Sequence, residues 1–316
     1  MKKLKWGIGV FFMTTGLYLT LYFALCKVEY RELPLVYLFS DYLGPNGGFT
    51  YNKSIEWDEA QKSATQWDVI VLGASRAERS YDPAFFKSKG IQLFNWGTSA
   101  QSLQNSYLLL KHILEEAQPK AVWLDIVPAS FKPEALESTA DLIQNVTSNQ
   151  LAYNFAWSSS DIRSVNLLSK RFFCENVKWE KKGRSQYHSQ GFVSVSDSMG
   201  EKLYNECLRN VKHQRAYVQP SVEARLALKE IIELCRVKGV SLTCIISPTT
   251  PLYNMQDHAW MMAYLNELKK EHTFNIVDYA GDGQFQIPND FYDEKHLNHS
   301  GALKFDSLFL STMKLQ

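Results

Sequence analysis

The sequence predicts an α/β fold: a three-layer α/β/α sandwich on a mostly parallel, doubly wound sheet, preceded by one transmembrane helix. Short apolar runs rich in Val and Ile alternate with longer amphipathic stretches, which is the pattern of βαβ units. The first of these runs ends in a turn of small residues at 73–75, and residues 6–26 carry no charge. Of the 316 residues, 45 % are hydrophobic, which is enough for a buried core.

The uncharged run near the N-terminus has the length of a membrane span. It comprises the 21 residues from Trp6 to Cys26, which as a helix would extend about 30 Å. Three lysines precede it, at positions 2, 3 and 5, whereas the two basic residues that follow are diluted by two glutamates. Because positive charge is retained inside the cell, we expect a cytoplasmic N-terminus and a periplasmic or extracellular domain.

Two other interpretations of this run remain open. A cleaved signal peptide usually has an apolar stretch of about 7 to 15 residues followed by a small-x-small cleavage site, whereas this run is longer and no such site follows. A lipid anchor on Cys26 would require a small residue before it, and the chain has Leu25 there. We therefore expect residues 1–27 to form an uncleaved single-pass membrane anchor.

The alternation of strands and helices begins after this anchor. Five apolar runs predict strands, at Asp68–Leu72, Ile91–Phe94, Ala121–Val127, Val240–Ile246 and Asn275–Tyr279. Three amphipathic stretches between them predict helices, at 100–117, 222–237 and 257–270. This order predicts a parallel sheet with helices on both faces.

Two stretches interrupt the pattern. Residues 28–66 contain Gly and Pro at 44–48 and predict a connecting segment with little regular structure, so that the α/β domain proper spans residues 67–316. Residues 129–219 have no clean periodicity and predict an insertion or lid. Residues 161–215 include eleven basic and six acidic residues. This excess fits a solvated surface or a contact with an anionic envelope polymer.

Polar residues follow the predicted strands where a doubly wound sheet collects functional groups. The first strand leads into Gly73-Ala74-Ser75-Arg76, which places Ser75 near the amino end of a helix, where free N–H groups favour an oxyanion. The second leads into Asn95-Trp96-Gly97, whose glycine permits close backbone approach to a substrate. Near the chain end, Asp293 and His296 are spaced so that the carboxylate can orient the imidazole.

Each of these features also has a simpler interpretation. A serine after a strand is often a helix N-cap. Asp293 and His296 could ligate a metal together with His299, although three ligands so close in sequence rarely converge. We expect no metal and no cofactor.

Taken together, Gly-x-Ser at 73–75, the glycine at 97 and Asp-x-x-His-Leu-Asn at 293–298 resemble the SGNH (GDSL-like) hydrolase superfamily. The resemblance extends over about residues 67–310. It implies that Ser75 is the nucleophile, His296 the general base and Asp293 the residue that orients it. It also implies an oxyanion hole formed by the N–H groups of Ser75 and Gly97.

The anchor and the Gly-Ala-Ser-Arg turn resemble more narrowly the bacterial, membrane-anchored envelope branch of this superfamily, with its teichoic-acid D-alanylation and polysaccharide O-acetylation proteins. One block departs from the superfamily pattern. An Asn normally follows the middle strand, but here that strand continues as Leu-Asp-Ile-Val-Pro at 124–128. A side-chain donor worth about 3 kcal/mol in the transition state is therefore missing.

The sequence thus predicts an envelope-facing serine esterase or O-acyltransferase. It would act through an acyl-serine on acyl esters, with acetyl as the expected group, of a cell-surface polysaccharide or other acylated glycan, and a membrane acyltransferase is a candidate partner. The net charge of +1 does not favour nucleic acid. The alternative is a catalytically inactive SGNH-fold protein that binds or helps to assemble an envelope polymer. The missing Asn and the basic stretch favour this alternative, whereas the complete set of nucleophile, base and orienting residue favours catalysis.

Overall fold

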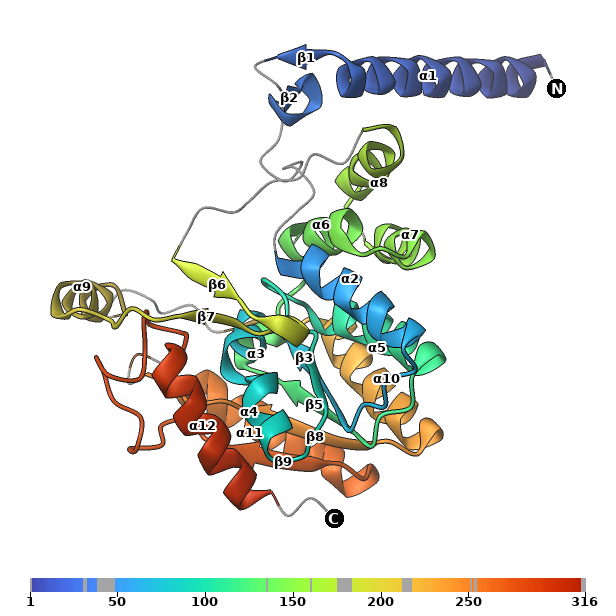
Figure 1. Cartoon of the computed structure of the whole chain (residues 1–316). Helices are drawn as coiled ribbons and strands as arrows, with labels where there is room; N and C mark the ends of the chain where they lie inside the picture. Colours follow the sequence, from blue (N-terminus) through green and yellow to red (C-terminus); the bar gives the residue numbers. More distant parts are fainter. Residues whose placement is uncertain are drawn as a thin grey trace.

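The computed structural model describes residues 2–30, 33–38, 49–134, 136–159, 161–174, 184–211, 218–250, 252 and 255–313. It confirms the predicted α/β class, since helices cover both faces of one central sheet and a long apolar helix precedes them (Figure 1). The Gly- and Pro-containing stretch at 44–48 lies outside the described residues, as does part of the basic stretch at 161–215.

The central sheet has five parallel strands in the order β4-β3-β5-β8-β9. They are β3 (Val69–Gly73), β4 (Leu93–Asn95), β5 (Ala121–Asp125), β8 (Ser241–Ile246) and β9 (Asn275–Asp278). Each overlaps one of the five predicted runs. The three middle strands are almost entirely buried, which explains why their sequences are continuous apolar runs rather than alternating ones.

The strand order reverses at β3. This strand pairs with β4 on one side and with β5 on the other, so the chain crosses β3 between them. In open α/β sheets, ligands bind beyond the carboxyl ends of the strands at such a reversal. The turn that follows β3 therefore lies where the topology favours a site.

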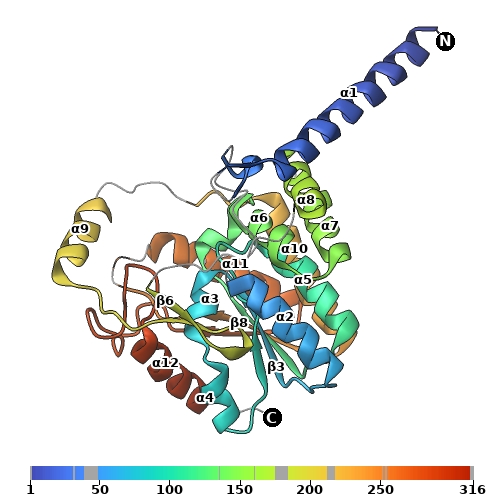
Figure 2. The same ribbon diagram turned by 45° about the horizontal axis from the view of Figure 1, so that its top comes forward.

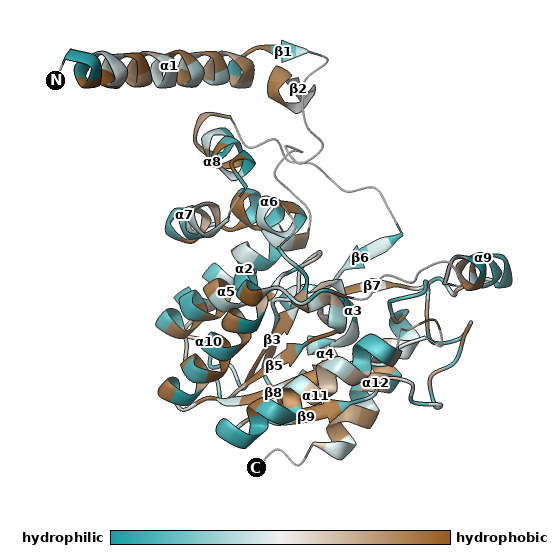
Figure 3. Ribbon diagram, turned by 180° about the vertical axis from the view of Figure 1, so that it is seen from behind, coloured by the Kyte–Doolittle hydropathy of each residue, from teal (hydrophilic) through white to brown (hydrophobic). Residues whose placement is uncertain are grey.

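Helices on the two faces complete the sandwich. One layer contains α5 (Leu103–Glu116), α10 (Val222–Lys238) and α11 (Met255–Glu271), which correspond to the three predicted helices and share one apolar cluster. The opposite layer contains α4 (Pro83–Ser88) and α12 (His299–Thr312), which belong to a second cluster rich in aromatic residues. Figure 3 shows the apolar residues concentrated on the strands between these layers.

A helix in the expected connecting segment corrects the prediction there. Residues Phe49–Lys62 form α2, where little regular structure was expected. Its Trp57 is buried and stacks on Trp67 at a centroid distance of 5.9 Å, with edge contacts to Phe94 and Trp96. The sequence conceals this helix because most of its residues are polar. It belongs to the folded domain.

Further short elements lie where the sequence predicted irregular structure. Before α2 the chain forms β1 (Glu29–Tyr30), β2 (Leu33–Pro34) and η1 (Leu35–Leu38). The predicted insertion contains η3 (Pro128–Phe131), α6 (Leu136–Asn145), α7 (Asn149–Ser158), α8 (Arg163–Phe173), β6 (Ser185–Tyr187), η4 (Ser189–Gly191), β7 (Val193–Val195) and α9 (Glu201–Val211). In its described part the predicted insertion is therefore largely helical.

The expected N-terminal helix is α1 (Lys2–Lys27), and among the described residues it alone is long and apolar enough to cross a membrane. Figure 2 shows α1 extending away from the domain. Near its carboxyl end Tyr22 and Cys26 are buried, and Cys26 forms a disulfide with Cys174. The Cys26 sulfur is thus not free to carry a lipid. Cys235 and Cys244 are buried thiols, as expected.

Helix α12 begins directly after the loop that carries Asp293 and His296. Asn298 caps it by accepting a hydrogen bond from the Gly301 N–H at 2.9 Å. A Cβ atom on Gly301 would lie only 2.1 Å from the Asp290 carbonyl oxygen. Only glycine allows this approach between helix and loop, so the start of α12 is held against the chain that precedes His296.

We expect Gly301→Ala to lower the free energy of unfolding by about 2 kcal/mol, because the added methyl group meets backbone that cannot move aside cheaply. Thermal unfolding of the detergent-solubilised protein measures this. Gly283→Ala is the matched control, since a Cβ there meets nothing within 4 Å. Equal unfolding midpoints for the two variants would contradict the expected packing.

Candidate active site

Ser75 is placed by a sharp turn after β3. Gly73 has φ +140, and a Cβ there would lie 2.5 Å from the Asp125 carbonyl oxygen, so the turn requires glycine. The next helix, α3 (Ser75–Ser80), has Ala74 as its N-cap, with no capping side chain. Ser75 is therefore the first helical residue and not the cap. Its side chain is free for another partner.

The structure brings the three predicted side chains together. The Ser75 Oγ lies 2.8 Å from His296 Nε2, across 221 positions of the sequence. On the other side of the ring, His296 Nδ1 lies 2.8 Å from Asp293 Oδ2 and 3.0 Å from Oδ1. The imidazole and the carboxylate keep only 15 % and 27 % of their side-chain surface exposed. This is the arrangement of a nucleophile, a base and an orienting acid.

The Asp293 carboxylate also organises its own loop. Its Oδ1 accepts hydrogen bonds at 2.8 Å from the backbone N–H groups of Lys295 and His296. Burial raises the pKa of Asp293, but the hydrogen bond and charge of His296, together with these N–H groups, outweigh burial and leave the pKa below its ordinary value. Asp293 is thus held ionised beside the imidazole.

An aromatic side chain stacks on the imidazole, and a cationic side chain lies against that aromatic ring. The Tyr292 ring stacks on His296 with centroids 5.5 Å apart and an interplanar angle of 10°. The Arg79 guanidinium lies 5.4 Å from the centre of the Tyr292 ring. Arg79 also donates to Ser185 Oγ of β6 at 3.2 Å. Tyr292 restricts the orientation of the histidine ring from a direction that Asp293 does not control.

Arg76, which the sequence placed in the Gly-Ala-Ser-Arg turn without a role, holds two loops of the site in place. One of its terminal nitrogens donates to the Lys295 carbonyl at 3.0 Å. The other donates to the Ser247 and Pro248 carbonyls at 2.6 and 2.8 Å and to Ser247 Oγ at 2.9 Å. The residue beside Ser75 therefore binds both the loop after β8 and the loop that carries His296. Its position directly after the serine was the available signal.

The end of β5 carries Asp125 where the superfamily has a nearby Asn donor. Asp125 is buried and accepts a hydrogen bond from the Tyr81 hydroxyl at 3.0 Å. Burial raises the pKa of this carboxyl, although the Arg76 charge opposes the shift. The Asp125 carboxyl is thus bonded to Tyr81 and lies within reach of the Arg76 charge.

The position of Gly97 corrects one expectation. Its N–H donates to Asn95 Oδ1 at 3.0 Å, so in this structure it does not face the site as an oxyanion donor. The glycine is required for packing instead, since a Cβ there would lie 2.5 Å from the Glu78 backbone nitrogen. Of the two predicted donors, the Ser75 N–H remains, in the first turn of α3 where N–H groups have no acceptor within the helix.

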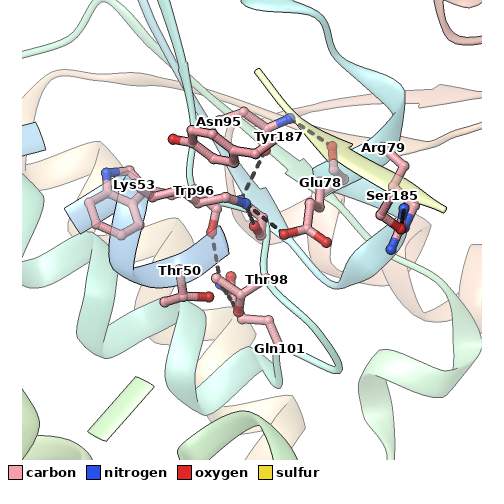
Figure 4. A network of polar contacts seen from close by, with 12 residues as sticks. Thr50, Lys53, Glu78, Arg79, Asn95, Trp96, Thr98, Gln101, Ser185 and Tyr187 are labelled. Carbon is pink, nitrogen blue, oxygen red and sulfur yellow. Dashed lines mark hydrogen bonds and ion pairs between the residues drawn. The ribbon is translucent and has the colours of Figure 1, made fainter. Parts of the chain in front are cut away.

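A buried ion pair supports this glycine loop from α2. Lys53 Nζ donates to Glu78 Oε1 at 2.9 Å and also to the Gly97 carbonyl oxygen. Figure 4 shows the pair beside Asn95, Thr98 and Gln101. Burial lowers the pKa of the fully buried Lys53, and the Glu78 carboxylate opposes that shift. The sequence did not reveal this pair, because Lys53 lies in the expected connecting segment.

The three candidate metal ligands do not converge. His299 lies 4.0 Å from Asp82, and its ring packs against His188 and Phe192 rather than against the Asp293 carboxylate. The described residues contain no group of three or more side chains suited to a metal ion.

Removing either partner of the buried ion pair between Lys53 and Glu78 leaves the charge of the other unpaired. We therefore expect Lys53→Met to lower the free energy of unfolding by about 3 to 5 kcal/mol. The double variant Lys53→Met/Glu78→Met should recover part of this loss, and a chemical denaturation series measures both. Lys270→Met breaks an exposed pair with Glu267 and is the control. A double variant no more stable than Lys53→Met would contradict the pairing.

The lowered pKa of Asp293 predicts a pH-dependent contribution to stability. A carboxyl with a lower pKa in the folded state stabilises that state when ionised, and the benefit disappears on protonation. The stability difference between wild type and Asp293→Asn should therefore be larger at about pH 5 than at about pH 3. Urea unfolding at both pH values tests this. A difference that does not shrink on acidification would contradict a lowered pKa.

Sequence comparisons add little to this geometry. A protein-family model without a functional description matches residues 205–315, about a third of the chain. No curated protein matches the sequence.

Three solved structures are similar to the chain. A "putative acylhydrolase" from Bacteroides fragilis is 15 % identical with a TM-score of 0.38, covering 81 % of this chain and 94 % of that one. A "putative platelet activating factor" from Streptococcus pneumonia is 13 % identical with a TM-score of 0.39, covering 88 % and 97 %. A GDSL-like lipase from Bacteroides thetaiotaomicron is 12 % identical with a TM-score of 0.38, covering 82 % and 97 %. The chain is thus similar, at low identity, to acylhydrolase and GDSL-like lipase structures.

Proposed function

We propose that the chain is an SGNH-type serine esterase or O-acyltransferase that works through an acyl-serine. One observation carries the proposal: the Ser75 Oγ lies 2.8 Å from His296 Nε2, while His296 Nδ1 is held 2.8 Å from Asp293. A serine hydroxyl is a weak nucleophile unless a base removes its proton, and the base must be held in the right tautomer. The contacts of His296 with Ser75 and with Asp293 support both conditions.

The reaction follows from these contacts. His296 Nε2 accepts the Ser75 proton while Oγ bonds to the ester carbonyl carbon and the carbonyl oxygen becomes an oxyanion. Asp293 holds the Nδ1 proton and stabilises the imidazolium. Collapse breaks the bond to the alkoxy oxygen, which leaves with the proton from Nε2, and the acyl group remains on Ser75. A water or a second hydroxyl then attacks this ester by the same steps in reverse.

The site offers few hydrogen-bond donors to the oxyanion. The Ser75 N–H at the start of α3 is available, but the Gly97 N–H is bonded to Asn95 and no Asn follows β5. Loss of one such donor costs roughly 10² to 10³ in rate. This deficit raises the barrier to attack by water and by a second hydroxyl alike, and so favours slow turnover.

The expected location suggests the substrate. The α1 helix fits a membrane anchor, and a disulfide between Cys26 and Cys174 fits an oxidising compartment outside the cytoplasm. Together with the resemblance to the bacterial envelope branch, these features support acetyl esters of a cell-surface polysaccharide as the substrate. A membrane acyltransferase that supplies the acyl group is the partner we propose.

Fluorophosphonate labelling of the full-length protein in detergent tests the proposal. We expect an adduct on Ser75 in the wild type, no adduct in Ser75→Ala, and labelling slowed by about a hundredfold or more in His296→Ala, which lacks the base. Ser99→Ala removes an exposed serine that contacts Glu137 and should label normally. Hydrolysis of p-nitrophenyl acetate by the same variants measures turnover.

The same labelling experiment distinguishes the serine enzyme from the second candidate, a catalytically inactive protein. If the folded wild type forms no adduct at Ser75, the activated serine is contradicted. The paired Gly97 N–H and the absent Asn donor would then favour a catalytically inactive protein that binds an envelope polymer.

A further inference from the structure

Helix α8 is attached to the carboxyl-terminal third of α1. The Tyr22 hydroxyl donates to the Asn166 carbonyl at 2.7 Å, and the Tyr18 hydroxyl donates to Asn166 Oδ1. The Phe23 ring makes an edge contact with Phe173 at 5.9 Å, and the Cys26–Cys174 disulfide follows directly. These contacts fix α8 beside α1 over more than two helical turns.

This attachment sets the depth of α8 relative to a bilayer. A helix needs about 20 residues to cross the hydrocarbon core, so a span that starts at Trp6 ends near Leu25. Tyr18 then lies about 10 Å inside that outer end, at 1.5 Å per residue. A span that started at Leu4 would still leave Tyr18 about 8 Å inside. Tyr22, which bonds to the same residue, lies about 4 Å inside, so Asn166 lies between these two depths.

The surface of α8 next to α1 is apolar and exposed. Ile162, just before the helix, is 79 % exposed, Val165 is 45 % exposed and Phe172 is 57 % exposed. Positions 162, 165–166, 169 and 172–173 follow one another at intervals of three or four, so they share one face of the helix. The exposed apolar residues thus continue the same face that contacts α1, while Leu167 is buried in the domain.

We propose that α8 lies in the outer interface of the bilayer beside α1 and presents Ile162, Val165 and Phe172 to the lipid acyl chains. Interfacial helices bury their apolar face by about 5 to 10 Å, which agrees with the depth set by Tyr18. The proposal rests on the proposed role of α1 as a membrane anchor. It gives the domain a second contact with lipid, and so a fixed orientation of the Ser75 site toward the membrane surface.

Spin labels on the full-length protein in liposomes test the proposal. Single cysteines replace Ile162, Val165 or Phe172 in a Cys207→Ser background. The native Cys235 thiol does not compete for label, because burial raises its pKa to about 12, and burial likewise raises the pKa of Cys244. Collision with oxygen, which concentrates among acyl chains, is compared with collision with a water-soluble nickel chelate.

Two labelled positions calibrate this ratio. Phe11→Cys on α1 is the lipid reference and Val237→Cys on α10 the aqueous reference, and both native side chains are 64 % exposed. We expect at least two of the three α8 labels to give an oxygen-to-nickel ratio several-fold above that of Val237→Cys and close to that of Phe11→Cys.

The other outcomes overturn the proposal in distinguishable ways. Labels at α8 that match Val237→Cys, while Phe11→Cys stays in lipid, would place α8 in water and leave the anchor intact. Labels that neither reagent reaches would indicate a protein partner on this face instead of lipid. A water-accessible Phe11→Cys would contradict the anchor itself. None of these outcomes depends on the activity of Ser75, which fluorophosphonate labelling measures separately.

Discussion

The site depends on the guanidinium of Arg76, which joins loops that lie far apart in the sequence. Ser75 follows the first strand of the sheet, and His296 lies 221 positions later in a loop. Arg76 donates to the carbonyl of Lys295 in that loop and to the chain after β8. A planar group with several fixed donors can hold two carbonyl-rich loops at once, which a lysine cannot do with the same geometry. By holding these two loops, Arg76 helps to keep His296 within hydrogen-bond distance of Ser75.

The features that the sequence predicts well have local causes. The strands are continuous apolar runs because both faces of the sheet are covered, so β3, β5 and β8 can be recognised without knowing their neighbours. The turn at Gly73 and the spacing of Asp293 and His296 are also local. Topology then brings these motifs to the same edge of the sheet. The fold class and the three central side chains could therefore be predicted from one sequence.

The features that the sequence conceals depend on partners far along the chain. Nothing near Lys53 indicates that it pairs with Glu78 inside the protein, since a lysine in a polar stretch normally predicts a solvated surface. Five cysteines allow many pairings, and only the packing of α8 on α1 selects Cys26 and Cys174. In each case the missing information is tertiary contact.

The disulfide between Cys26 and Cys174 also changes what cleavage of the chain can do. The two residues are separated by 148 positions, a stretch that contains Ser75 and the strands β3, β4 and β5 of the central sheet. A protease that cuts once anywhere between them divides the backbone, yet both fragments remain covalently joined through sulfur. A single cut between these cysteines therefore separates α1 from the rest of the domain only where a reductant also breaks the disulfide. The bond makes the attachment of the domain to α1 tolerant of a single backbone cut.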